Sequence, residues 1–101
     1  MTVKEQFLND IQEAIQEDNR GLLEVYIEMP GMRGREKITN SFMNFQAKHD
    51  YYEKAYDDDL HLKANSNIFI TFYEVGGKKV EVTEWHGPQR IKTKLSLLFM
   101  R

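Results

Sequence analysis

The sequence predicts an α+β fold in which two helices pack on one face of a mainly antiparallel sheet of three to four strands. Three patterns predict this fold: apolar residues recur at three- and four-residue steps in two segments, alternate in a third, and form a β-rich run that ends at a Gly-Gly pair. The expected order is helix, strand, helix and then three strands. Because 101 residues suffice for one hydrophobic core, we expect residues 1–101 to form a single domain.

The first helix is expected to begin at Thr2, because Thr2 and Glu5 have the spacing of a capping box. An apolar stripe follows at helical spacing, and Gly21 suits the left-handed residue that closes a helix. From Leu22 to Met29 the apolar period changes to two, which is typical of a strand with one buried face. Proline and glycine residues then predict a loop from Pro30 to Lys37.

A second helix is expected after Thr39, because aromatic residues then repeat at alternating steps of three and four. Leu60 and Leu62 extend or widen the same apolar stripe, and the Asn-Ser-Asn sequence at 65–67 is the expected exit from the helix. The three aspartates at 57–59 make a poor helix interior, so the pattern leaves the end of this helix open by several residues.

A β-hairpin is expected from Ile68–Val75 to Lys79–Thr83, joined through the Gly-Gly pair. A two-residue loop sets Phe72 opposite Glu81, whereas a three-residue loop with a bulge sets Phe72 opposite Val82. We favour the bulged register, because a slip of one residue reverses the face that each side chain occupies.

Residues 89–101 fit two descriptions. Apolar residues alternate as in a strand, but several of them also fit one face of a helix. Arg90, Lys92 and Lys94 would then lie in the first turns of that helix, where the helix dipole disfavours cations. We therefore favour a strand, on whose outer face lysines are common.

The expected core combines the apolar faces of all these elements. Its members are Phe7, Leu8, Ile11, Ile15, Val25, Ile27, Phe45, Tyr52, Ile68, Ile70, Phe72, Val80 and Val82.

Composition excludes several classes of protein. The chain has no cysteine and only three histidines, which argues against a structural zinc site. No apolar run approaches the roughly 18 residues of a membrane span, and the N-terminus lacks the apolar segment of a secretory signal. We therefore expect a soluble, cytoplasmic protein with no membrane partner and no cofactor.

Few side chains could carry chemistry. Asp57 and His61 would share a helix face and could hold a divalent cation, but an acidic run near a helix end is more typical of a solvated surface. His49 and Asp50 are neighbours, and adjacent helical residues point in different directions. A packed, hydrogen-bonded His49 is therefore expected rather than a general base. No nucleophile motif is present, so we expect no enzyme activity.

A basic loop and a basic C-terminal segment could together follow a phosphate backbone. Glycines in the loop would let backbone N–H groups approach an anion, and an aromatic residue such as Tyr26 or Trp85 could stack on a base. The net charge of −2 would weaken non-specific attraction. The candidate nucleic-acid contacts are Arg33, Arg35, Lys37, Lys92 and Lys94.

The second helix could instead present a protein-binding surface. Tyr51, Tyr56 and Asp58 combine large aromatic area with negative charge, as many protein interfaces do. A partner could also bind at a sheet edge, where a homodimer could form.

One segment resembles a known family. From Glu36 to Ile70, and most specifically in the run Tyr-Tyr-x-Lys-Ala-Tyr-Asp-Asp-Asp-Leu that ends at Leu60, the chain resembles small proteins of phages, prophages and mobile elements of Gram-positive bacteria. That family has no assigned activity, so the resemblance implies a phage or prophage origin and no mechanism. We expect a non-catalytic accessory protein that binds a protein partner, with nucleic-acid binding and metal-dependent catalysis as the alternatives.

Overall fold

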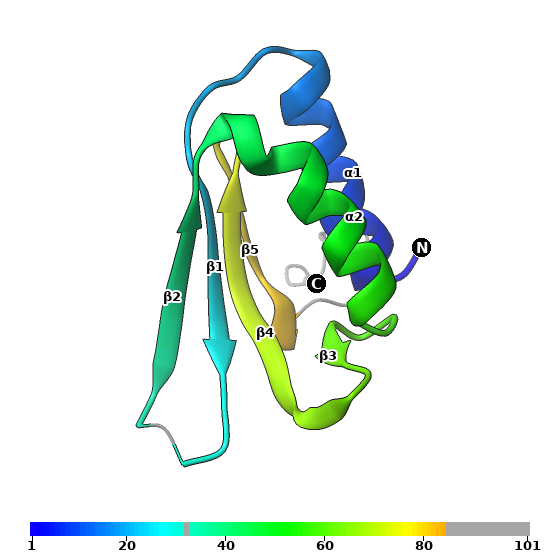
Figure 1. Ribbon diagram of the computed structural model, residues 1–101, viewed down its shortest axis with the longest axis vertical. Helices are drawn as coiled ribbons and strands as arrows, with labels where there is room; N and C mark the ends of the chain where they lie inside the picture. The colour runs from blue at the N-terminus through cyan, green and yellow to red at the C-terminus, as the bar shows by residue number, and fades with distance from the viewer. Residues whose placement is uncertain (32, 85–101) are drawn as a thin grey trace, which may run out of the picture.

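Two helices and five strands make up residues 1–31 and 33–84, the part of the chain that the computed structural model describes (Figure 1). The helices are α1 (Val3–Gln16) and α2 (Phe45–Ala55), and two 3₁₀ turns, η1 (Phe42–Asn44) and η2 (Val82–Glu84), follow β2 and β5. The strands are β1 (Leu23–Glu28), β2 (Arg35–Asn40), β3 (His61–Leu62), β4 (Asn65–Val75) and β5 (Lys78–Glu81). The predicted strand at 89–101 lies outside the described residues.

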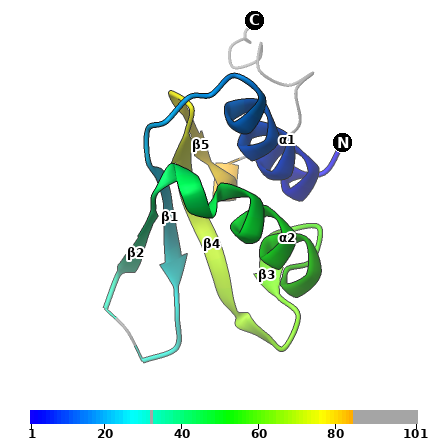
Figure 2. The ribbon, with the colours of Figure 1, turned by 45° about the horizontal axis from the view of Figure 1, so that its top comes forward.

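The strands form one sheet in the order β2-β1-β4, and β4 pairs along its other edge with β3 near its start and with β5 near its end. Every one of these pairings is antiparallel. Figure 2 shows α1 and α2 side by side, on the same side of β4. The predicted α+β class, with two helices on a mainly antiparallel sheet, is thus confirmed, while the sheet has five strands instead of three to four and the order of elements differs.

The start of α1 is confirmed and its end is corrected. The Thr2 hydroxyl accepts the Glu5 backbone N–H at 3.1 Å, and the Glu5 carboxylate accepts the Thr2 N–H at 2.8 Å. The helix ends at Gln16, and Asp18 adopts the left-handed conformation with φ of 55°. Gly21 was therefore the wrong candidate for the closing residue, because aspartate tolerates this conformation and comes earlier in the chain.

Strand β2 is absent from the predicted order, because its sequence lacks an apolar alternation. Its residues are exposed except for the half-buried Ile38 and Asn40. Pairing with β1, for example of Lys37 with Tyr26, is what holds it extended. The loop predicted from Pro30 to Lys37 is thus too long, since β2 already begins at Arg35.

A tight turn ends α2 earlier than its apolar stripe suggested. The Asp57 carboxylate accepts the backbone N–H groups of Asp59 at 3.0 Å and His61 at 2.9 Å. Leu60 follows with φ of 65° and is fully buried, so it enters the core from the turn and not from the helix. Leu62 belongs to β3, and the expected exit at 65–67 is instead the start of β4.

The hairpin between β4 and β5 has the register that we did not favour. Phe72 lies opposite Glu81, and the loop has two residues, Gly76 and Gly77, with φ of 60° and 82°. Positive φ at both positions is what a two-residue hairpin turn requires to match the twist of its strands. The three-residue loop with a bulge was wrong.

The irregularity in β4 occurs on its other edge, against β1. Tyr26 pairs with Phe72 and Ile27 with Ile70, so Thr71 is an extra residue in β4. Such a bulge shifts the alternation by one residue. Tyr73 therefore points into the core and Phe72 points out of it, the reverse of the expectation for Phe72.

The core lies between the sheet and the two helices. Phe7 of α1 is at its centre, with its ring 5.0 Å from that of Tyr52 and 4.5 Å from that of Tyr73. The predicted members that are buried are Phe7, Ile11, Val25, Ile27, Phe45, Tyr52, Ile70 and Val82, and those that are partly buried against them are Leu8, Ile15, Ile68 and Val80.

Candidate functional site

The face of the sheet opposite the helices carries aromatic side chains that project from β1, β3 and β4. Among the described residues, α1 and α2 both pack against the other face. We call this surface the open face. The register places on it Glu24, Tyr26 and Glu28 of β1, Arg35, Lys37 and Thr39 of β2, His61 of β3, Phe69, Phe72 and Glu74 of β4, and Lys79 and Glu81 of β5.

Two aromatic rings form the centre of the open face. Tyr26 and Phe72 meet edge to face with ring centroids 5.4 Å apart, and both are only half-buried. With Arg35 and Glu81 they line a shallow hollow of about 480 Å³. The Arg35 guanidinium lies 5.8 Å from the centre of the Tyr26 ring, within the range of a cation–π contact.

A second aromatic pair continues this surface toward β3. The His61 ring stacks on Phe69 at 4.7 Å and 17°. His61 Nδ1 lies 2.7 Å from the Ser66 carbonyl oxygen, which can only accept, so Nδ1 carries a proton and donates it. This bond fixes the ring orientation.

Charged side chains surround the aromatic centre: those of β2 are basic, whereas β5 contributes both Lys79 and Glu81. β2 contributes Arg35 and Lys37, and Lys37 is 3.9 Å from the Glu24 carboxylate. β5 contributes Glu81, whose carboxylate accepts the Thr83 hydroxyl at 3.1 Å. The open face is thus basic along β2 and has a carboxylate at the β5 end of its hollow.

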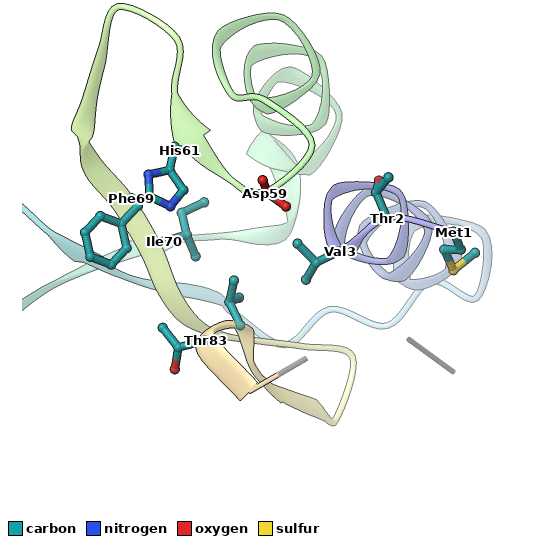
Figure 3. A pocket seen from close by; sticks show the side chains of 9 residues that line it. Met1, Thr2, Val3, Asp59, His61, Phe69, Ile70 and Thr83 are labelled. Atoms are coloured by element: carbon teal, nitrogen blue, oxygen red, sulfur yellow. The ribbon is translucent and has the colours of Figure 1, made fainter. Parts of the chain in front are cut away.

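A cleft of about 420 Å³ lies beside β4, between β3 and β5 (Figure 3). Figure 3 shows the His61 ring beside Phe69, while Asp59 lies on the side of the cleft near Val3. The remaining lining residues are Met1, Thr2, Ile70, Val82 and Thr83. Its two titratable side chains, Asp59 and His61, both come from the turn after α2 that leads into β3.

The metal site considered at Asp57 and His61 has another role in the structure. These residues do not share a helix face, because α2 ends at Ala55. Asp57 holds the turn through its carboxylate, and His61 Nδ1 bonds a backbone carbonyl. Both side chains are therefore explained by local structure.

A different group has spacing that suits a metal ion. His49, Asp50 and Glu53 of α2 offer ligand atoms within 4.8 Å of one another. His49 Nδ1 is 3.1 Å from the Asp50 carboxylate, so the expectation that these neighbours cannot pair was wrong. Hydrogen bonds from His49 and then Gln46 hold the pKa of Asp50 below its usual value. Both carboxylates are exposed, as is common for acids on a helix surface.

The surface predicted on α2 is divided between core and solvent. Tyr51 is 47% exposed, whereas Tyr56 is 3% exposed and packs edge to face on Tyr52 at 5.5 Å. Burial raises the pKa of Tyr56 to about 12. Asp58 is exposed, and its carbonyl accepts the Lys4 backbone N–H at 3.2 Å. Tyr51 and Asp58 can contact a partner, but Tyr56 cannot do so without leaving the core.

The predicted nucleic-acid contacts are also divided. Arg35 and Lys37 lie on the open face beside Tyr26, while Arg33 is exposed in the loop between β1 and β2. Lys92 and Lys94 lie outside the described residues.

Sequence reasoning missed two residues of the hollow, Phe72 and Glu81. The alternation of Leu22 to Met29 correctly placed Tyr26 on the outer face. Phe72 was assigned to the core because the sequence gives no sign of the bulge at Thr71. The two-residue register of the hairpin, which sets Glu81 beside Phe72, was the signal that could have found the hollow.

Comparison with known proteins gives no relative from which a function could be transferred. No protein-family model, curated protein or solved structure matches this chain. Neither helix in the described ranges has the length and apolar character needed to cross a membrane.

Proposed function

We propose that this protein is a non-catalytic accessory protein, of phage or prophage origin, that binds a protein partner through the open face. The observation that carries the proposal is the hollow lined by Tyr26, Phe72, Arg35 and Glu81. Tyrosine and arginine dominate the energetics of protein interfaces, especially where apolar rings are surrounded by polar groups.

The charges of the open face favour a protein over a nucleic acid as the partner. Arg35 and Lys37 could contact phosphates, as could Lys79. Four carboxylates share the same surface, those of Glu24, Glu28, Glu74 and Glu81, and they would repel a phosphate backbone. A protein partner can satisfy both signs of charge, since its own surface carries both.

Photocrosslinking in cells tests this proposal. A benzophenone amino acid would replace Lys79, which is exposed on the open face, and in a matched control Lys54, which is exposed on α2. We expect protein adducts from position 79 and not from position 54, and we expect Phe72→Ala to remove them while the protein stays folded.

Other outcomes would contradict the proposal. Equal labelling from both positions, or none from position 79, would show that the open face is not a binding surface. Adducts from position 79 that nucleases digest would favour the nucleic-acid alternative instead.

A further inference from the structure

We infer that the open face binds the open face of a second copy of this chain, so that two sheets pack face to face as a symmetric dimer. The inference rests on the proposed function, because it uses the same surface and names its protein partner. Packing on another sheet is a common way to cover the exposed face of an antiparallel sheet.

The order of side chains across the open face is the first argument. One line of cross-strand partners runs from Lys37 of β2 through Tyr26 and Phe72 to Glu81 of β5. The line is basic at one end, aromatic in the middle and acidic at the other end. A surface with this polarity is complementary to its own reversed copy.

Symmetry determines how the two copies would meet. A two-fold axis that lies between the sheets and runs parallel to the strands places β2 of one copy over β5 of the other. Lys37 then faces the partner's Glu81, and Tyr26 faces the partner's Phe72. Each contact occurs twice. A two-fold axis across the strands would instead place the basic strands β2 on each other.

The same axis also places Glu24 opposite the partner's Glu74, so the acids of this row need cations within their own sheet. Glu24 already has a cation at 3.9 Å, the Lys37 ammonium, and Glu74 and Glu28 lie directly opposite Lys79 and Arg35 in the strand register. Each of these acids therefore has a cross-strand or diagonal cation of its own on the same face. Glu81 has neither a basic cross-strand partner nor a basic diagonal partner in the pairings of the described strands, and in the dimer it faces Lys37 of the other copy, which then lies between Glu24 and Glu81.

The size of the face indicates a reversible dimer. Four strands about 4.8 Å apart, with six residues rising about 3.3 Å each, span roughly 15 by 20 Å. The face thus covers about 300 Å², well below the roughly 800 Å² of accessible surface that each partner of a standard interface buries. We therefore expect association at high micromolar concentration.

Pairing through the exposed edge of β2 is the competing arrangement. Arg35, Glu36 and Lys37 all lie on this short edge strand, and charged residues on edge strands oppose such pairing. An edge dimer would also leave Glu81 far from the interface, since β5 lies at the other side of the sheet. Substitution of Glu81 therefore distinguishes the two arrangements.

Sedimentation equilibrium at low salt tests the dimer with Lys37→Glu, Glu81→Lys and the double variant. Each single variant places like charges together at both symmetric contacts, and we expect its dimer dissociation constant to rise about tenfold. An equimolar mixture of the two single variants should form heterodimers, because one contact is reversed in sign and the other is native. The double variant should dimerise like the original protein.

The matched controls are Lys54→Glu and Glu53→Lys on the exposed surface of α2, which should leave the dissociation constant unchanged. Circular dichroism would establish that every variant is folded.

Three results would overturn the inference: a protein that stays monomeric up to about 1 mM, a dimer that Glu81→Lys does not weaken, or a mixture that does not associate. If the protein is monomeric but position 79 still forms adducts with other proteins, the inferred dimer is wrong and the proposed function stands. If position 79 gives no adducts with any protein, including itself, both fail.

Discussion

The two faces of the sheet use aromatic residues in different ways. On the helix-covered face, Phe7, Tyr52 and Tyr73 are almost completely buried and contact one another. On the open face, Tyr26 and Phe72 contact each other but remain partly exposed. The same strands thus carry stability on one side and a surface available for binding on the other.

A polar contact marks the difference most clearly. The Tyr73 hydroxyl donates to the buried carboxylate of Asp10 at 2.6 Å, and Gln6 donates to the same carboxylate at 2.9 Å. Lys78 lies 3.6 Å from Asp10 and also bonds Glu13. This cluster joins α1 to the hairpin of β4 and β5. Tyr26 has no such hydroxyl contact among the described residues.

The largest expected difference between the faces is in aromatic truncation. Phe7→Ala should lower the free energy of unfolding by about 3–5 kcal/mol, because it leaves a cavity beside two buried rings. Phe72→Ala, the matched change on the open face, should cost about 1 kcal/mol or less, since its ring is already partly solvated. Urea unfolding measures both, and equal losses would show that the open face belongs to the core.

Removal of one hydroxyl should give a smaller difference. Tyr73→Phe leaves the buried Asp10 carboxylate without its closest donor and should cost about 1–3 kcal/mol. Tyr26→Phe should change the free energy of unfolding by no more than about 0.5 kcal/mol. If the two variants unfolded at the same urea concentration, the Tyr73 hydroxyl would contribute no more to stability than the Tyr26 hydroxyl.

Alkaline pH should destabilise the protein through the buried tyrosines on the helix-covered side of the sheet. Burial raises the pKa of Tyr56 from 10.0 to about 12, and burial also raises the pKa of Tyr52 and Tyr73. A raised pKa means that the folded state holds the proton more tightly, so stability is fully present below pH 10 and falls as pH rises toward 12.

Urea unfolding between pH 9 and 11.5, with absorbance to follow tyrosine ionisation, measures this loss. Tyr56→Phe should make stability less dependent on pH in that interval. A stability that does not change up to pH 11.5 would contradict burial of these hydroxyls.

The smallest effect is expected from the ion pair on the open face. Glu24→Gln removes a carboxylate that is 3.9 Å from a half-exposed ammonium, and the free energy of unfolding should change by less than about 0.5 kcal/mol. A loss above about 1 kcal/mol in thermal unfolding would mean that this face contributes to stability after all.

The sequence by itself determined those features that depend on neighbouring residues. The capping box at Thr2 and Glu5, the apolar stripe of α1, and the alternation that points Val25 inward and Tyr26 outward were all predicted correctly. Each is a local pattern, in which backbone geometry alone sets the direction of the side chain. The α+β class follows from these patterns.

Only the tertiary structure decided where elements begin and end and where the alternation of inward and outward side chains changes along β4. β2 is a strand because β1 pairs with it, and α2 ends because the Asp57 carboxylate bonds the backbone of the turn. The bulge at Thr71 exists because β4 must match the register of β1, and it exchanges the places of Phe72 and Tyr73. Strand pairing involves residues far apart in the chain, so local periodicity could not show that Phe72 belongs to the open face.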